Sequence, residues 1–193
     1  MPVVSRIETA AATRRALLDA AGELLDTGGP AAVTLRGVGA RAGVSRSAPY
    51  RHFADKESLL TELGNEAWNQ VGDVLEALTS SASAAPERSL RTALLSLVAI
   101  GRRRPHLYRL MFTKPAGDPV AAVLAAERVQ DLFLRIVAGR VGPNHARQYG
   151  GLLLTSVHGI TDLELSGHLI WDKWHSTPED LVELLICLLP AAP

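Results

Sequence analysis

The residues best suited to chemistry lie in one short stretch, Thr34 to Glu57, which reads TLRGVGARAGVSRSAPYRHFADKE. Hydroxyl, phenol, imidazole, guanidinium and ammonium groups recur through it at short intervals, and each can donate a hydrogen bond. From residue 34 to residue 56 it holds five basic residues against Asp55 alone, a formal charge of +4, whereas the whole chain balances 20 basic with 20 acidic residues. Such a concentration of donors and positive charge is suited to binding the phosphates and base edges of a nucleic acid.

The first helix that would position these groups is predicted to begin after Thr34, a favourable N-cap residue. Leu35, Val38 and Ala42 then follow at i, i+3 and i+7, which puts them on one helical face. Gly43 supplies the positive φ that a sharp turn needs, and we expect it to end this helix.

A second helix is predicted from Ser45 to Phe53, with Ser45 as its cap and Val44 packed beneath the corner. Ala48 and Phe53 would face the core, which leaves the polar side chains between them exposed. Pro49 removes a backbone donor near the start of this helix and is expected to push Ala48 towards an extended conformation.

A further helix start follows at Asp55, which is predicted to cap it. Lys56 then lies in the first turn, where the positive end of the helix dipole disfavours a cation. A bound anion would remove that penalty, so this lysine indicates a phosphate beside the helix.

Together these motifs resemble the N-terminal helix-turn-helix domain of the tetracycline-repressor-type family of bacterial transcriptional regulators. The matching segments are Thr34-Leu35-Arg36, Ala42-Gly43-Val44-Ser45, Tyr50-Arg51-His52-Phe53 and Asp55-Lys56-Glu57. They fall within roughly residues 13 to 65, and Pro49 stands where most members carry Leu, Ile or Val. The resemblance implies phosphate contacts by Thr34, Tyr50, His52 and Lys56, and positions near base edges for Arg36, Arg46 and Ser47. With the other donors of the second helix, the expected DNA-binding residues are Thr34, Arg36, Ser45, Arg46, Ser47, Tyr50, Arg51, His52 and Lys56.

The remainder of the chain is predicted to be helical, which gives an all-α fold. The sequence has no run of alternating β-branched and polar residues, while Ala and Leu dominate long segments of helical periodicity. Two domains are expected, a three-helix helix-turn-helix domain at residues 10–60 and a helical effector-binding and dimerisation domain at residues 61–193. The predicted helical segments are about Thr13–Asp26, Asp55 to beyond Leu78, Pro86–Ile100, Pro105–Thr113, Asp118–Val141, Ala146–Leu169 and Pro178–Leu189, with a linker at Thr79–Ala85.

The second half resembles the C-terminal domain subgroup named for a Trp-His-Gly pattern. The matching residues are Pro105, Leu107 to Phe112, His158-Gly159 and Leu163-Glu164, although no tryptophan precedes His158. In that family the last two helices form a four-helix dimer interface and the others enclose an effector pocket. The expected pocket residues are Tyr108, Met111, Phe112, Phe133, His158 and Asp162, for each of which core packing or a local hydrogen bond is the alternative explanation.

Several other kinds of site are not indicated. His168 and His175 lack a third close ligand, and no glycine-rich phosphate loop, Gly-x-Ser-x-Gly motif or pair of catalytic carboxylates is found. We therefore expect no metal, no cofactor and no enzymatic activity. Cys187, the single cysteine, is expected to be buried, and Arg102 to Arg104 are expected to cap a helix end in solvent.

Targeting signals are also not indicated. The first residues lack the apolar core of a secretory signal, and the most apolar stretch, Leu152 to Trp171, contains Asp162 and Glu164. We interpret that stretch as a buried helix and expect a cytoplasmic protein without membrane contact.

The combined interpretation is a homodimeric, ligand-responsive repressor that binds a palindromic double-stranded DNA operator and a small-molecule effector. An activator or dual regulator would show the same DNA contacts. Two further alternatives are a small-molecule-binding or enzymatic protein with a vestigial DNA reader, and an architectural DNA binder without an effector.

Overall fold

The computed structural model describes residues 6–80, 85–113 and 119–190. Within these ranges the chain forms ten α-helices and no strand, which confirms the expected all-α fold. The helices are α1 (Arg6–Ala32), α2 (Leu35–Arg41), α3 (Ala48–His52), α4 (Lys56–Ser80), α5 (Pro86–Arg103), α6 (Pro105–Met111), α7 (Pro119–Val141), α8 (Ala146–Leu165), α9 (Trp171–Trp174) and α10 (Pro178–Cys187).

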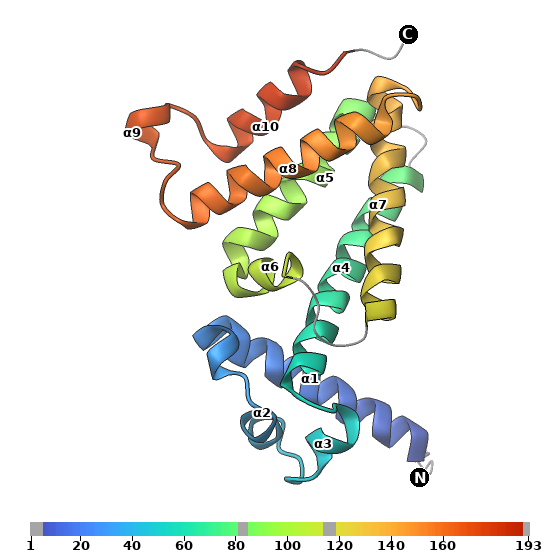
Figure 1. The fold of residues 1–193 in the computed structure, drawn as a ribbon, viewed down its shortest axis with the longest axis vertical. Helices are drawn as coiled ribbons and strands as arrows, with labels where there is room; N and C mark the ends of the chain where they lie inside the picture. Colours follow the sequence, from blue (N-terminus) through green and yellow to red (C-terminus); the bar gives the residue numbers. More distant parts are fainter. Residues whose placement is uncertain (1–5, 81–84, 114–118, 191–193) are drawn as a thin grey trace.

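The helices gather into a small group and a larger one that α4 connects (Figure 1). Helices α1 to α3 surround the start of α4 at one end of the molecule, and α4 then runs along α7 in the larger group. On the opposite side α5 packs against α8 and α10, which lie next to each other. The boundary expected at residue 60 therefore falls inside one continuous helix.

The apolar face of α4 joins both groups into one hydrophobic core. Leu59 and Leu63 are buried near the small group, whereas Val71 and Leu75 are buried farther along the same helix. Each step of four residues advances about 40° around the helix, so the stripe winds gradually around α4 along its length. Val74, the apolar residue just before Leu75, is exposed.

Local sequence signals set several helix ends as predicted. Thr177 accepts a hydrogen bond from the Asp180 backbone N–H, and the Asp180 carboxylate accepts one from the Thr177 N–H, a reciprocal capping box at the start of α10. These bonds hold the pKa of Asp180 below its ordinary value. Gly142 has φ +80° immediately after α7.

Other predicted boundaries were wrong. Helix α1 begins at Arg6 rather than Thr13, and after non-helical Gly28 and Gly29 one more turn follows to Ala32. Helix α8 ends at Leu165 instead of Leu169, because Gly167 has φ +73° and the next N–H groups donate back into the last turn. The short α9 was not predicted. Of the predicted linker, residues 81–84 lie outside the described residues, as does Asp118 before α7.

Two further expectations are corrected by tertiary contacts. Cys187 is exposed, because it lies on the outer side of α10. Arg102 does not simply cap α5: its guanidinium donates to Glu164 of α8 at 2.7 Å and to Glu179 of α10 at 2.6 Å. The hydrogen bonds from Arg102 lower the pKa of Glu179. Arg104 likewise donates to Asp26 of α1 at 2.8 Å.

No helix in the described ranges combines the length and apolarity needed to cross a membrane.

Close helix packing at Gly101 yields a test of this architecture. A Cβ at that position would lie 2.5 Å from Thr161 Cγ2, and the buried Thr161 is fixed by donating to the Val157 carbonyl at 2.8 Å. We therefore expect Gly101→Ala to lower the free energy of unfolding by about 1–3 kcal/mol, the usual cost of overpacking. Urea unfolding at fixed protein concentration measures this value.

Gly64→Ala is the matched control, because a Cβ at Gly64 meets no atom within 4 Å. The gain in helix propensity should raise stability by about 0.5–1 kcal/mol. Equal effects of the two substitutions would contradict the close approach of α5 and α8.

Candidate functional site

The two helices of the basic stretch are held by a cap, a turn and a close contact. Thr34 Oγ1 accepts a hydrogen bond from the Gly37 N–H at 3.0 Å and caps α2 as predicted. Gly43 adopts φ +67° between α2 and α3, also as predicted. A Cβ on Gly39 would lie 2.7 Å from Pro49 Cγ, so α2 and α3 approach closely there. This contact gives Pro49 a packing role.

The second helix is shorter than predicted. It begins at Ala48, and the Ala48 N–H donates to the Ser45 carbonyl at 3.0 Å across a turn. Ser45 is therefore not its cap, and Ser47 at the actual N-cap makes no side-chain capping bond. Ala48 is helical, not extended, because its burial beside α2 outweighs the local preference before Pro49. Pro49 lies in the first turn, where a missing N–H breaks no helical bond.

Most of the expected DNA-binding side chains are exposed; they belong to α2 with its cap, the turn before α3, α3 and the first turn of α4, which together we call the basic surface. Phe53 and Ala48 are buried, as predicted, beneath this surface. Tyr50 is 60% exposed, which is unusual for a large aromatic side chain. His52 and Lys56 are half-buried, and the other members are exposed, namely Thr34, Arg36, Ser45, Arg46, Ser47 and Arg51.

The cations of this surface differ in whether a carboxylate neutralises them. Arg41 forms an ion pair with Glu23 of α1. No ion pair within the described ranges engages the other four, which are Arg36, Arg46, Arg51 and Lys56. Their positive charge is therefore available to an external anion.

The start of α4 is fixed by the predicted cap. Asp55 Oδ1 accepts hydrogen bonds from the Ser58 N–H and hydroxyl, both at 2.7 Å, while the Asp55 N–H donates to Ser58 Oγ at 3.1 Å. The backbone and then the side-chain bond from Ser58 lower the pKa of Asp55. Lys56 is thereby held in the first turn, where the helix dipole favours a nearby anion.

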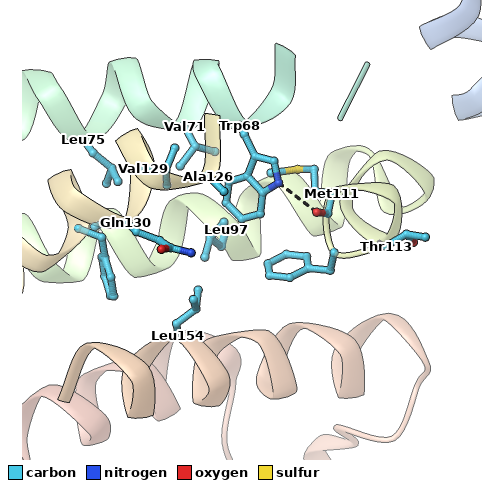
Figure 2. A pocket seen from close by; sticks show the side chains of 13 residues that line it. Trp68, Val71, Leu75, Leu97, Met111, Thr113, Ala126, Val129, Gln130 and Leu154 are labelled. Carbon is cyan, nitrogen blue, oxygen red and sulfur yellow. Dashed lines mark hydrogen bonds between the residues drawn. The ribbon is translucent and has the colours of Figure 1, made fainter. Parts of the chain in front are cut away.

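A cavity of about 440 Å³ lies in the larger helical group (Figure 2). Three residues expected in an effector pocket line it, namely Met111, Phe112 and Phe133. Ten residues not assigned to it from the sequence complete the wall, namely Trp68, Val71, Leu75, Ala93, Leu97, Thr113, Ala126, Val129, Gln130 and Leu154. Trp68 lies three and seven residues before Val71 and Leu75, so helical spacing could have revealed that shared face.

Tyr108, His158 and Asp162 do not line this cavity. Tyr108 is fully buried, and its hydroxyl lies 2.9 Å from His158 Nδ1. The His158 ring stacks on Phe112 with centroids 4.1 Å apart, so the pair supports the cavity wall from behind. Asp162 is exposed on α8. Burial raises the pKa of Tyr108 to about 12, with Asp162 adding to the shift and a Thr161 hydrogen bond opposing it.

Metal ligands do not cluster in the described part of the chain, where no group of three His, Cys, Asp or Glu residues could hold an ion.

Sequence comparisons cover both helical groups. Residues 17–63 match the family model described as bacterial regulatory proteins, tetR family. Residues 90–189 match the model described as a tetracyclin repressor-like C-terminal domain. No curated protein matches the chain.

Solved structures share the same architecture. A protein of unknown function from Rhodococcus sp. RHA1 is 27% identical with a TM-score of 0.75, over 91% of this chain and 92% of that chain. A TetR-family transcriptional regulator from Streptomyces coelicolor is 23% identical with a TM-score of 0.65, over 93% and 94%. The structure of a SmeT–triclosan complex is 22% identical with a TM-score of 0.61, over 94% and 97%.

The buried Tyr108–His158 contact predicts a specific response to alkaline pH. An unfolded tyrosine ionises near pH 10, whereas folded Tyr108 resists ionisation until about pH 12. Its neutral form therefore contributes stability that is present below pH 10 and lost as pH rises towards 12. We expect the stability difference between wild type and Tyr108→Phe to shrink across this window in urea unfolding.

At pH 7 the same substitution should cost about 1 kcal/mol of unfolding free energy, because it removes the partner of His158. Tyr149→Phe is the control, since the Tyr149 hydroxyl makes no hydrogen bond with any described residue and its loss should cost less. A larger cost for the control would refute the assigned role of the Tyr108 hydroxyl.

Proposed function

Because the chain belongs to the tetR family of bacterial regulatory proteins, we propose that it is a ligand-responsive repressor that binds a palindromic operator as a homodimer. The observation that carries this proposal is the exposed basic surface of α2, α3 and the start of α4. Four cations there have no carboxylate partner among the described residues, and Tyr50 in the same stretch is exposed. This function would place the protein in the cytoplasm with the DNA.

Two kinds of DNA contact are proposed for this surface. Thr34, Tyr50, His52 and Lys56 hold phosphates and set the orientation of the domain. Arg36, Arg46 and Ser47 read base edges in the major groove, where arginine can bind guanine through two hydrogen bonds. Ser45, in the turn before the short helix, and Arg51, near its C-terminal end, add further donors.

The dimer is proposed to form through the outer faces of α8 and α10. Leu152 of α8, Leu184 of α10 and Leu188 at the C-cap of α10 are exposed, and Leu188 reaches 72%. Apolar side chains at this density on adjacent helices are favourable when a second copy covers them. A two-fold axis would place the two DNA-binding domains about 34–36 Å apart, so the operator should be roughly palindromic.

The effector is proposed to occupy the 440 Å³ cavity and to act through α4. Trp68, Val71 and Leu75 of this helix line the cavity, while Lys56 at its start lies on the basic surface. A ligand that displaces α4 would therefore change the distance between the two DNA-binding domains of the dimer. The SmeT–triclosan complex has the same fold, which supports a small-molecule site in this architecture.

Selection of binding sites from random duplex DNA with the purified protein tests the proposal. We expect enrichment of a palindromic motif at moderate salt, because two equivalent readers must contact two half-sites. Weak binding without any enriched motif would overturn operator recognition and favour a vestigial reader. Reporter expression after gene deletion then distinguishes a repressor, whose targets rise, from an activator, whose targets fall.

The division between base and phosphate contacts predicts different behaviour of two variants. Arg46→Ala should weaken operator binding by about 1–3 kcal/mol and relax sequence preference if that side chain reads a guanine. Lys56→Ala should weaken all DNA sequences alike and lower the slope of log affinity against log salt by about one. Equilibrium titrations at several salt concentrations measure both quantities. Indistinguishable behaviour of the variants would contradict the proposed roles.

A further inference from the structure

The wall of the 440 Å³ cavity carries no charged side chain among the described residues. The cation on α7 nearest in sequence to the lining residues, Arg128, donates instead to Asp73 at 2.9 Å and to Glu76 at 2.7 Å on α4. Transferring an ion from water into such an apolar site is costly when no counter-charge receives it. The cavity therefore favours an uncharged ligand.

The size and the aromatic lining of the cavity suit flat rings. Trp68 and Phe112 meet edge to face with centroids 5.2 Å apart, and Phe133 adds a third aromatic side chain to the lining. A dry apolar cavity of about 150 Å³ accommodates benzene, so 440 Å³ has room for roughly three such rings. Aromatic walls of this kind interact well with an aromatic ligand.

Only one polar side chain in the lining makes no hydrogen bond with any described residue. The Trp68 indole N–H donates to the Met111 carbonyl at 3.0 Å, and the Thr113 hydroxyl donates to the Arg109 carbonyl at 2.9 Å. The Gln130 amide has no such partner in the described ranges; its side chain is exposed, and Figure 2 shows the amide directed towards the other residues that line the cavity. An amide offers both a donor and an acceptor to a ligand.

We propose that the effector is an uncharged, mainly aromatic molecule of about three rings, oriented by a hydrogen bond with Gln130. This inference rests on the proposed function for the identity of the site, and it adds the class of ligand and the residue that determines specificity. The apolar walls supply most of the affinity, whereas Gln130 selects ligands that carry a carbonyl or N–H group at the matching position.

Four tricyclic probes of similar size test the ligand class. Acridone is neutral and carries a carbonyl and an N–H, anthracene is neutral and apolar, 10-methylacridinium is a cation, and anthracene-9-carboxylate is an anion. Trp68 becomes the only tryptophan in the Trp171→Phe, Trp174→Phe double variant, so its fluorescence reports binding at the cavity. We expect acridone to bind about tenfold or more tightly than either ion. Equal or tighter binding of an ion, or no binding of acridone, would overturn the proposal.

Gln130→Leu tests the specificity residue at nearly constant side-chain size. It should weaken acridone about fivefold and change anthracene less than about twofold, because only acridone loses a hydrogen bond. Gln148→Leu, at an exposed glutamine of α8 outside the cavity, should leave both probes unchanged. Equal losses for acridone and anthracene in Gln130→Leu would contradict the hydrogen bond.

A cavity-filling variant and an operator assay separate this inference from the proposed function. Ala126→Phe should abolish acridone binding by occupying the site, and retained binding would place the probe elsewhere and refute the proposal. Release of the selected operator by acridone is measured independently. Binding without release would contradict ligand-responsive regulation while supporting the assigned ligand class. Operator binding without any acridone binding would contradict the ligand class and leave the proposed DNA recognition standing.

Discussion

The apolar face of α4 is the constraint on which the rest of the structure depends. Leu59 and Leu63 anchor its first half beside α1 to α3, and Val71 and Leu75 anchor its second half beside α7, within one hydrophobic cluster. A helix buried at both ends cannot tilt in one group without altering contacts in the other, because packed cores resist small local distortions. The cap at Asp55 fixes where α4 begins, beside the basic surface. The position of that surface therefore depends on the same helix that lines the cavity.

Ion pairs add to the buried apolar contacts between α1 and the rest of the molecule. Arg14 pairs with Glu62 at 2.9 Å, Arg15 with Glu66 at 3.2 Å, and Arg104 of the α5–α6 corner with Asp26 at 2.8 Å. Exposed pairs of this kind contribute about 0–1 kcal/mol each, so they orient α1 without locking it.

The cavity is connected to these contacts of α1 through α6. Its last residues, Met111 and Phe112, lie in the cavity wall, and the Met111 carbonyl accepts the hydrogen bond of Trp68 from α4. Phe112 in turn stacks on His158, which the buried Tyr108 holds from the same short helix. The C-terminal end of α6 therefore contacts α4, α8 and the cavity. A ligand in contact with Phe112 would change the packing against both helices.

The sequence by itself determined the all-helical fold, the caps at Thr34, Asp55 and Thr177 and the turn at Gly43, because these depend on neighbouring residues and the local backbone. Tertiary structure decided what depends on distant contacts: the start of α3 at Ala48, which burial fixes, and the pairing of Arg102 with two other helices. It also left Cys187 exposed and set the cavity lining, which includes Gln130 but not Asp162. Spacing along a chain specifies which side of a helix a residue occupies, but only the packing of the other helices decides whether that side meets a core, a cavity or solvent.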